Sequence, residues 1–92
     1  MSIRVRVPAQ LRQLTGGESE LAFEGVSTVK DVLSKLVASY PELGGRIMGE
    51  DGRPRRFVNL FVADEDIRFL DGLETPLADG DVLSVVPAVA GG

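Results

Sequence analysis

The amino-acid sequence of 92 residues contains no cysteine, no histidine and no tryptophan. Without cysteine the chain can form no disulfide bond and offers no thiolate as a nucleophile or metal ligand. Without histidine it lacks the commonest metal ligand and the side chain best suited to proton transfer near neutral pH. We therefore expect a protein that is not itself an enzyme and that binds no metal and no cofactor of its own.

Long apolar runs and an excess of positive charge are also absent. No segment approaches the ~18 consecutive apolar residues that a membrane span needs. Residues 1–6 alternate apolar and polar side chains, unlike the apolar block of a signal peptide. A formal net charge of −4 would repel a nucleic-acid backbone overall. These patterns predict a cytoplasmic protein with neither a membrane nor a nucleic acid as its partner.

Alternation of apolar and polar residues near the N-terminus predicts a β-hairpin. Ile3, Val5 and Val7 recur with a period of two, which is typical of a strand with one buried face. A weaker alternation over 21–23 follows a turn signal at 15–17. We therefore expect two paired strands joined by a rather long connection.

A helical period follows and predicts one main helix. Apolar residues recur at i, i+3, i+4, i+7, i+8 and i+11 over residues 29–40. Ser27 or Thr28 can cap its N-terminus, and Asp31 falls in the first turn, where a negative charge is favourable. Pro41 should end the helix, because a residue that precedes proline is disfavoured in the helical conformation.

The second half of the chain reads as strands separated by turns. The expected order is a long connection over 41–56 with a short helical turn at 43–48, a strand over 57–63, a turn over 64–66, a short returning strand over 67–69 and a last strand over 82–86. One helix between hairpins predicts an α+β domain. We expect a β-grasp (ubiquitin-like) mixed sheet of four to five strands packed on that helix, with the first and last strands adjacent at the centre.

The C-terminus is predicted to be a functional tail. The chain divides into a domain over 1–86 and a flexible tail over 87–92 that ends in Gly91 and Gly92. Glycine has no Cβ, so the tail tip, with Val89 and Ala90 behind it, can enter a narrow channel. Adenylation by ATP would convert an oxygen of the Gly92 carboxylate into a good leaving group, and a sulfur nucleophile could then form a thiocarboxylate. A terminal glycine pair alone is a weak signal, because glycine pairs also occur in turns.

Several motifs of the C-terminal third resemble those of the ThiS/MoaD superfamily of ubiquitin-like sulfur carriers, and most closely its CysO branch. They are Arg56-Phe57-Val58-Asn59, Asp64-Glu65-Asp66-Ile67-Arg68-Phe69, Leu77-Ala78-Asp79-Gly80-Asp81 and Ala88-Val89-Ala90-Gly91-Gly92. The resemblance implies a β-grasp fold and adenylation by an E1-like enzyme. It also implies a Gly92 thiocarboxylate that donates sulfur, most closely for cysteine biosynthesis.

In that scheme the partner enzymes supply the cofactors. ATP is used by the activating enzyme, PLP belongs to a cysteine synthase that accepts the sulfur, and a metallopeptidase releases cysteine from the tail. Two alternatives remain open: a MoaD-type small subunit of molybdopterin synthase, and a ubiquitin-like modifier or interaction module.

Three further clusters have candidate roles. The acidic run 64–66 is expected to be a solvated turn rather than a cation site, because adjacent acids cannot all face one ion without further ligands. The arginines at 53, 55 and 56 are expected to lie in a solvated loop, with contact to an acidic partner surface as the alternative. If alternate residues of the strand over 57–63 face the helix, then Phe57 and Phe61 face outward beside Val86 and form a candidate docking patch for an activating enzyme.

Overall fold

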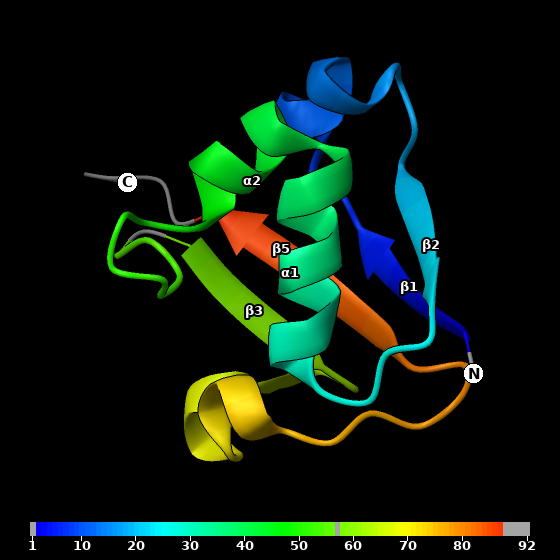
Figure 1. The fold of residues 1–92 in the computed structure, drawn as a ribbon, viewed down its shortest axis with the longest axis vertical. Helices are drawn as coiled ribbons and strands as arrows, with labels where there is room; N and C mark the ends of the chain where they lie inside the picture. Colours follow the sequence, from blue (N-terminus) through cyan, green and yellow to red (C-terminus); the bar gives the residue numbers. More distant parts are fainter. Residues whose placement is uncertain (1, 57, 88–92) are drawn as a thin grey trace.

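A mixed five-stranded sheet with helices on one face makes up the computed structural model, which describes residues 2–56 and 58–87 (Figure 1). Met1, Phe57 and residues 88–92 lie outside the described residues. In chain order the elements are β1 (Ser2–Arg6), η1 (Ala9–Thr15), β2 (Glu20–Glu24), α1 (Val29–Ser39), α2 (Pro41–Ile47), β3 (Val58–Val62), β4 (Glu65–Asp66), η2 (Ile67–Phe69), η3 (Gly72–Glu74) and β5 (Val82–Pro87), where η denotes a 3₁₀-helix.

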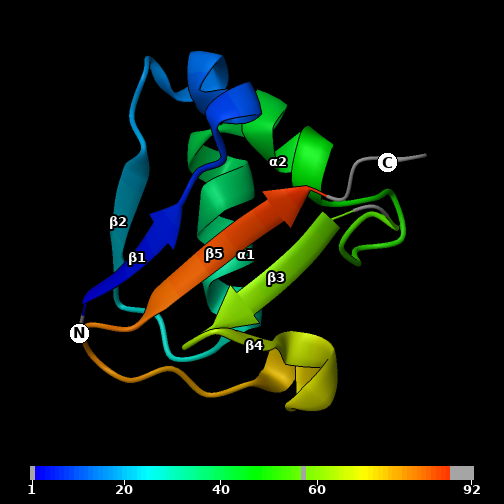
Figure 2. The ribbon, with the colours of Figure 1, turned by 180° about the vertical axis from the view of Figure 1, so that it is seen from behind.

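The strand order in the sheet is β2-β1-β5-β3-β4. The first and last strands, β1 and β5, are parallel neighbours, with Val5 opposite Leu83. The other strand pairs are antiparallel. Helix α1 crosses one face of the sheet, and the opposite face of the described sheet has no helix over it (Figures 1 and 2). The predicted β-grasp architecture with β1 and β5 adjacent at its centre is therefore confirmed.

Helix α1 is fixed at its N-terminus by a capping box. The Thr28 hydroxyl accepts a hydrogen bond from the Asp31 backbone N–H at 3.2 Å, and the Asp31 carboxylate accepts from the Thr28 backbone N–H at 3.2 Å. This reciprocal pair satisfies two N–H groups that have no partner within the helix. The same carboxylate accepts from the Ser27 backbone N–H at 3.0 Å, and this bond is the largest cause of a lowered Asp31 pKa.

The core lies between α1 and the sheet. The apolar stripe of α1 buries Val29, Val32, Leu33 and Leu36, and the facing strands bury a set of apolar side chains that includes Ile3, Val5, Leu60, Leu83 and Val85. Val37, a member of the predicted stripe, is instead 41% exposed, although it also lies against Gly44 of α2.

The short helical turn predicted at 43–48 is confirmed as helix α2, which begins two residues earlier, at Pro41, and ends at Ile47. Pro41 is at the N-terminus of α2, where its fixed φ suits a helix and its missing N–H costs nothing. Gly44 permits the close approach of α2 to α1: a Cβ on Gly44 would lie 2.8 Å from Val37 Cγ2 and 2.9 Å from Val37 Cα. The connection between β1 and β2 likewise contains a 3₁₀-helix, η1, that the sequence did not predict.

The predicted returning strand over residues 67–69 was wrong. A tight turn at Ala63 and Asp64, with φ values of 52° and 67°, reverses the chain after β3. Because this turn needs only two residues, the returning strand is β4, at Glu65–Asp66. Residues 67–69 then form the 3₁₀-helix η2, whose N-terminus is capped by the Asp66 carboxylate.

Candidate functional site

The base of the tail is held at the centre of the sheet. Strand β5 ends at Pro87, which pairs with Val58 of β3, and the start of the same strand pairs with β1. The predicted site residues Gly92, Gly91, Ala90 and Val89 follow Pro87 and lie outside the described residues. Their proposed roles stay predictions, but the point from which they continue is defined.

Three arginines share a pocket with this end of β5. A pocket of about 570 Å³ is lined by Pro87 together with Arg46, Arg55 and Arg56; these three arginines are called the basic collar below. All three side chains are exposed. Asp51 also lines the pocket, and its carboxylate accepts a hydrogen bond from the backbone N–H of Arg53 at 3.0 Å. The collar therefore places positive charge beside the last described residue of β5.

Local backbone bonds explain why the collar forms. Arg46 lies in the last turn of α2. The loop after α2 folds back on that helix, because the Arg55 backbone N–H donates to the Ile47 carbonyl and its side-chain Nε–H donates to the Gly45 carbonyl, both at 2.7 Å. A bridge between Met48 and Pro54 closes the same loop.

Ion pairs in the described residues lie elsewhere. Arg4 and Arg6 each lie 3.7 Å from the Glu20 carboxylate, and Arg68 pairs with Asp66 at 2.6 Å. Within residues 2–56 and 58–87, none of the ion pairs involves a collar arginine. The predicted basic cluster is thus an exposed loop feature, and the structure adds its position at the base of the tail.

The predicted docking patch faces the open side of the sheet. Leu60 and Val62 are buried toward α1, whereas Val86 is 42% exposed and Phe61 is half-buried. Phe61 lies opposite Ser84, and Phe61 and Val86 line a common pocket of about 370 Å³. The predicted orientation of Phe61 and Val86 is confirmed. Phe57, the third residue of the patch, lies outside the described residues, and the docking role of the patch stays a prediction.

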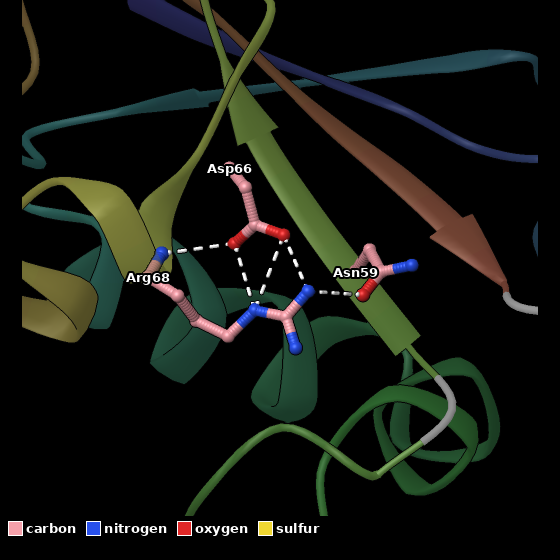
Figure 3. A network of polar contacts seen from close by, with 3 residues as sticks. All are labelled: Asn59, Asp66 and Arg68. Carbon is pink, nitrogen blue, oxygen red and sulfur yellow. Dashed lines mark hydrogen bonds and ion pairs between the residues drawn. The ribbon is translucent and has the colours of Figure 1, made fainter.

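Asp66 is not a solvated turn residue, and this part of the prediction was wrong. It is only 7% exposed, and its carboxylate accepts hydrogen bonds from the Arg68 guanidinium at 2.6–3.2 Å and from the Arg68 backbone N–H at 2.9 Å (Figure 3). The Arg68 guanidinium also donates to Asn59 of β3 at 2.9 Å. The side-chain bonds to Arg68 are the largest cause of a lowered Asp66 pKa.

This network fixes the turn after β3. Within the described part of the chain, no group of three or more acidic residues could hold a metal ion. In the same ranges, no helix is long and apolar enough to cross a membrane.

One surface feature was not found from the sequence. Phe69, at the end of η2, is 83% exposed, although an apolar residue in a predicted strand suggests burial. It is exposed because residues 67–69 form a 3₁₀-helix, in which Ile67 is buried and Phe69 is not. The strand predicted over 67–69 gave no indication that Phe69 is exposed.

Comparisons with known proteins relate the whole chain to one family. A model described as the ThiS family matches residues 5–92. The sulfur carrier protein CysO of Mycobacterium tuberculosis is 44% identical, with 100% of both chains covered. Small archaeal modifier protein 3 of Haloferax volcanii is 40% identical, also with 100% of both chains covered. A solved structure of the Amycolatopsis orientalis BexX/CysO complex contains a chain with a TM-score of 0.85 and 38% identity, covering 98% of this chain and 99% of that one.

Proposed function

The chain belongs to the ThiS family and is a sulfur carrier of the CysO/ThiS type, and from this premise we propose that the Gly92 carboxylate is its working group. An E1-like enzyme transfers AMP from ATP to this carboxylate and releases pyrophosphate. A sulfur nucleophile then displaces AMP and leaves a thiocarboxylate on Gly92. The carrier is a cosubstrate in these steps, and the catalytic groups and ATP belong to its partner.

The observation that carries this proposal is the attachment of the tail. Strand β5 lies between β1 and β3 and ends at Pro87, which pairs with Val58 of β3, and the family match extends from there to Gly92. The central position of β5 anchors the base of the tail in the described sheet. In the proposed function, the five residues that follow Pro87 enter the channel of the activating enzyme.

Cysteine biosynthesis is the most favoured destination of the sulfur. Full-length similarity to CysO proteins supports attack of the thiocarboxylate sulfur on an activated serine held by a PLP-dependent cysteine synthase, with departure of the activating group from the serine side chain. The tail would then carry cysteine as a thioester that rearranges to an amide of the cysteine amine, and a metallopeptidase would hydrolyse that amide to release cysteine and restore the Gly92 carboxylate. Each of these partners is part of the proposal, and the PLP and the metal ion belong to them.

The direct test is intact-mass spectrometry of the chain after incubation with an E1-like enzyme, ATP and a sulfur donor. We expect a mass gain equal to the exchange of one oxygen for sulfur, lost when Gly92 is deleted. Subsequent incubation with a cysteine synthase and activated serine should convert that species to a cysteine adduct. Absence of the first mass gain under conditions that activate an established carrier would contradict the proposed function.

Protein modification is a second candidate, favoured by the similarity to small archaeal modifier protein 3. The same adenylate would then be attacked by a lysine amine, and an isopeptide bond to Gly92 would form with release of AMP. Peptide mapping of a lysate from cells that express the tagged chain separates the two functions. Only the modifier function leaves Gly92 attached to lysine side chains of other proteins.

A further inference from the structure

Half of the acidic residues of this protein are concentrated in one segment. Seven of the fourteen acidic residues lie between positions 64 and 81, where Arg68 is the only basic residue. This segment contains β4, η2 and η3, which lie at the opposite end of the sheet from α2 and the end of β5 (Figures 1 and 2). The basic collar lies at the other end, beside Pro87, where Asp51 is the one acidic residue that lines the same pocket.

The length of the tail limits how far an enzyme can stay from the collar. Five residues separate Pro87 from the C-terminus, and five fully extended residues span at most about 18 Å. An active site that acts on Gly92 must bring its surface within that distance of Pro87. Because Gly92 has to enter the channel, the rim of the channel lies closer to Pro87 than this full reach, toward the range of about 8–10 Å over which charges interact appreciably at physiological ionic strength.

We propose that the basic collar of Arg46, Arg55 and Arg56 docks against an acidic protein surface around the channel of the activating enzyme. This inference rests on the proposed function of Gly92 and adds the chemistry of the surface that recognises the carrier. Opposite charge at the channel entrance accelerates encounter and orients the tail. The acidic segment 64–81 is repelled by the same surface, which disfavours approach of the wrong end.

The collar residues differ in how well they suit a test. The Arg55 side chain holds the loop on α2 through its bond to the Gly45 carbonyl, so its replacement would perturb the fold. Arg46 and Arg56 are exposed, and no hydrogen bond or ion pair of their side chains occurs within residues 2–56 and 58–87. Charge reversal at these two positions is expected to leave the free energy of unfolding unchanged within about 0.5 kcal/mol.

The experiment compares Arg56→Glu with Lys30→Glu, because each reverses one exposed charge. Lys30 lies in the first turn of α1, next to the Thr28–Pro76 bridge and therefore near the acidic end. Carrier-dependent pyrophosphate exchange by the E1-like enzyme gives kcat and KM for the carrier at several salt concentrations. The combined variant Arg46→Glu/Arg56→Glu extends the series.

We expect the combined variant to lower kcat/KM at low salt by about tenfold or more, through KM, with kcat at saturation preserved. Arg56→Glu should lower kcat/KM by less than the combined variant does, and the kcat/KM of Lys30→Glu should equal that of the unchanged protein. The salt dependence of kcat/KM should weaken in both collar variants.

If Arg56→Glu and Lys30→Glu have equal kinetics while the unchanged protein is activated normally, the proposed docking role of the basic collar is overturned. The proposed function of Gly92 would remain intact. A change in KM for ATP and not for the carrier would also overturn the docking role, since the arginines would then act on the nucleotide. Failure of the unchanged protein to support exchange would contradict the proposed function itself, and the collar with it.

Discussion

At the scale of single residues, Asp66 shows how one carboxylate determines a local structure. Its bonds to Arg68 cap η2, and the same guanidinium reaches Asn59 on the neighbouring strand. The sequence contains this acid within a run of three, and composition alone favours a solvated turn for all of them. The distinction between Asp66 and its neighbours arises only when the two-residue turn at Ala63 and Asp64 directs Asp66 inward.

Replacement of Asp66 by asparagine should destabilise the protein in a pH-dependent way. The lowered pKa of Asp66 means that the folded state favours the ionised form more than the unfolded state does. The contribution of the ionised carboxylate to the free energy of unfolding is therefore complete above the pKa of the unfolded state, about 3.9. This contribution is lost as the pH falls through the lower pKa of the folded state. At pH 7 we expect Asp66→Asn to lower the free energy of unfolding by roughly 1–2 kcal/mol.

Urea denaturation between pH 7 and pH 2.5 measures this difference, which should shrink at the acidic end. The matched control is Asp64→Asn, in the exposed turn with φ of 67°, where asparagine tolerates the left-handed conformation as well as aspartate does. A destabilisation of Asp66→Asn that is constant across this pH range would contradict the role of the ionised carboxylate.

At the scale of elements, hydrophobic periodicity predicted the helix and the strands that local sequence determines. It did not predict the full extent of α2, which depends on packing against α1. The α1 stripe and its capping residues are contiguous in sequence, and β1, β2, β3 and β5 follow from runs of alternating or apolar residues. Helix α2 has two glycines within seven residues, which weigh against a helix. It forms because Leu43 and Ile47 are fully buried and because Gly44 fits against Val37.

Paired alanine substitutions at Gly44 and Gly45 should separate helix propensity from packing. Both substitutions favour a helix by up to about 1 kcal/mol. A Cβ at Gly45 meets no atom within 4 Å, whereas at Gly44 it would lie 2.9 Å from the Val37 Cα atom. We expect Gly45→Ala to be neutral or stabilising and Gly44→Ala to cost roughly 1–3 kcal/mol through overpacking.

The midpoint of urea unfolding for the two variants provides the measurement. Equal stabilities would show that α1 and α2 move apart without cost. Such a result would contradict the close approach of the two helices as the reason for glycine at position 44.

At the scale of the whole molecule, the β-grasp sheet could be predicted because few arrangements accommodate one helix among sequential hairpins. The site could be predicted less completely. Gly92 and its neighbours follow from the end of the sequence and its family resemblance, whereas the basic collar depends on the loop after α2 folding back toward Pro87. Arg46 is seven residues from Arg53 in sequence, and nothing in that spacing indicates that it shares a pocket with the end of β5.

Deletion of Gly91 and Gly92 should separate stability from function. The last described pair of β5 joins Pro87 to Val58, and we expect thermal unfolding of the truncated chain to match that of the full chain, while thiocarboxylate formation is abolished. Differential scanning calorimetry and intact-mass spectrometry measure the two properties on one sample. A clear loss of thermal stability would show that the terminal glycines also support the fold.

The parallel pairing of β1 with β5 also constrains when the carrier becomes available during its synthesis. The sheet cannot close until its last strand has been made, because β5 occupies the position between β1 and β3. Pairing between the first and last strands of the described sheet is non-local and is slow compared with helix formation. An activating enzyme that recognises the folded sheet would thus encounter only chains that already contain β5, and a chain terminated before that strand would lack the element that completes the fold.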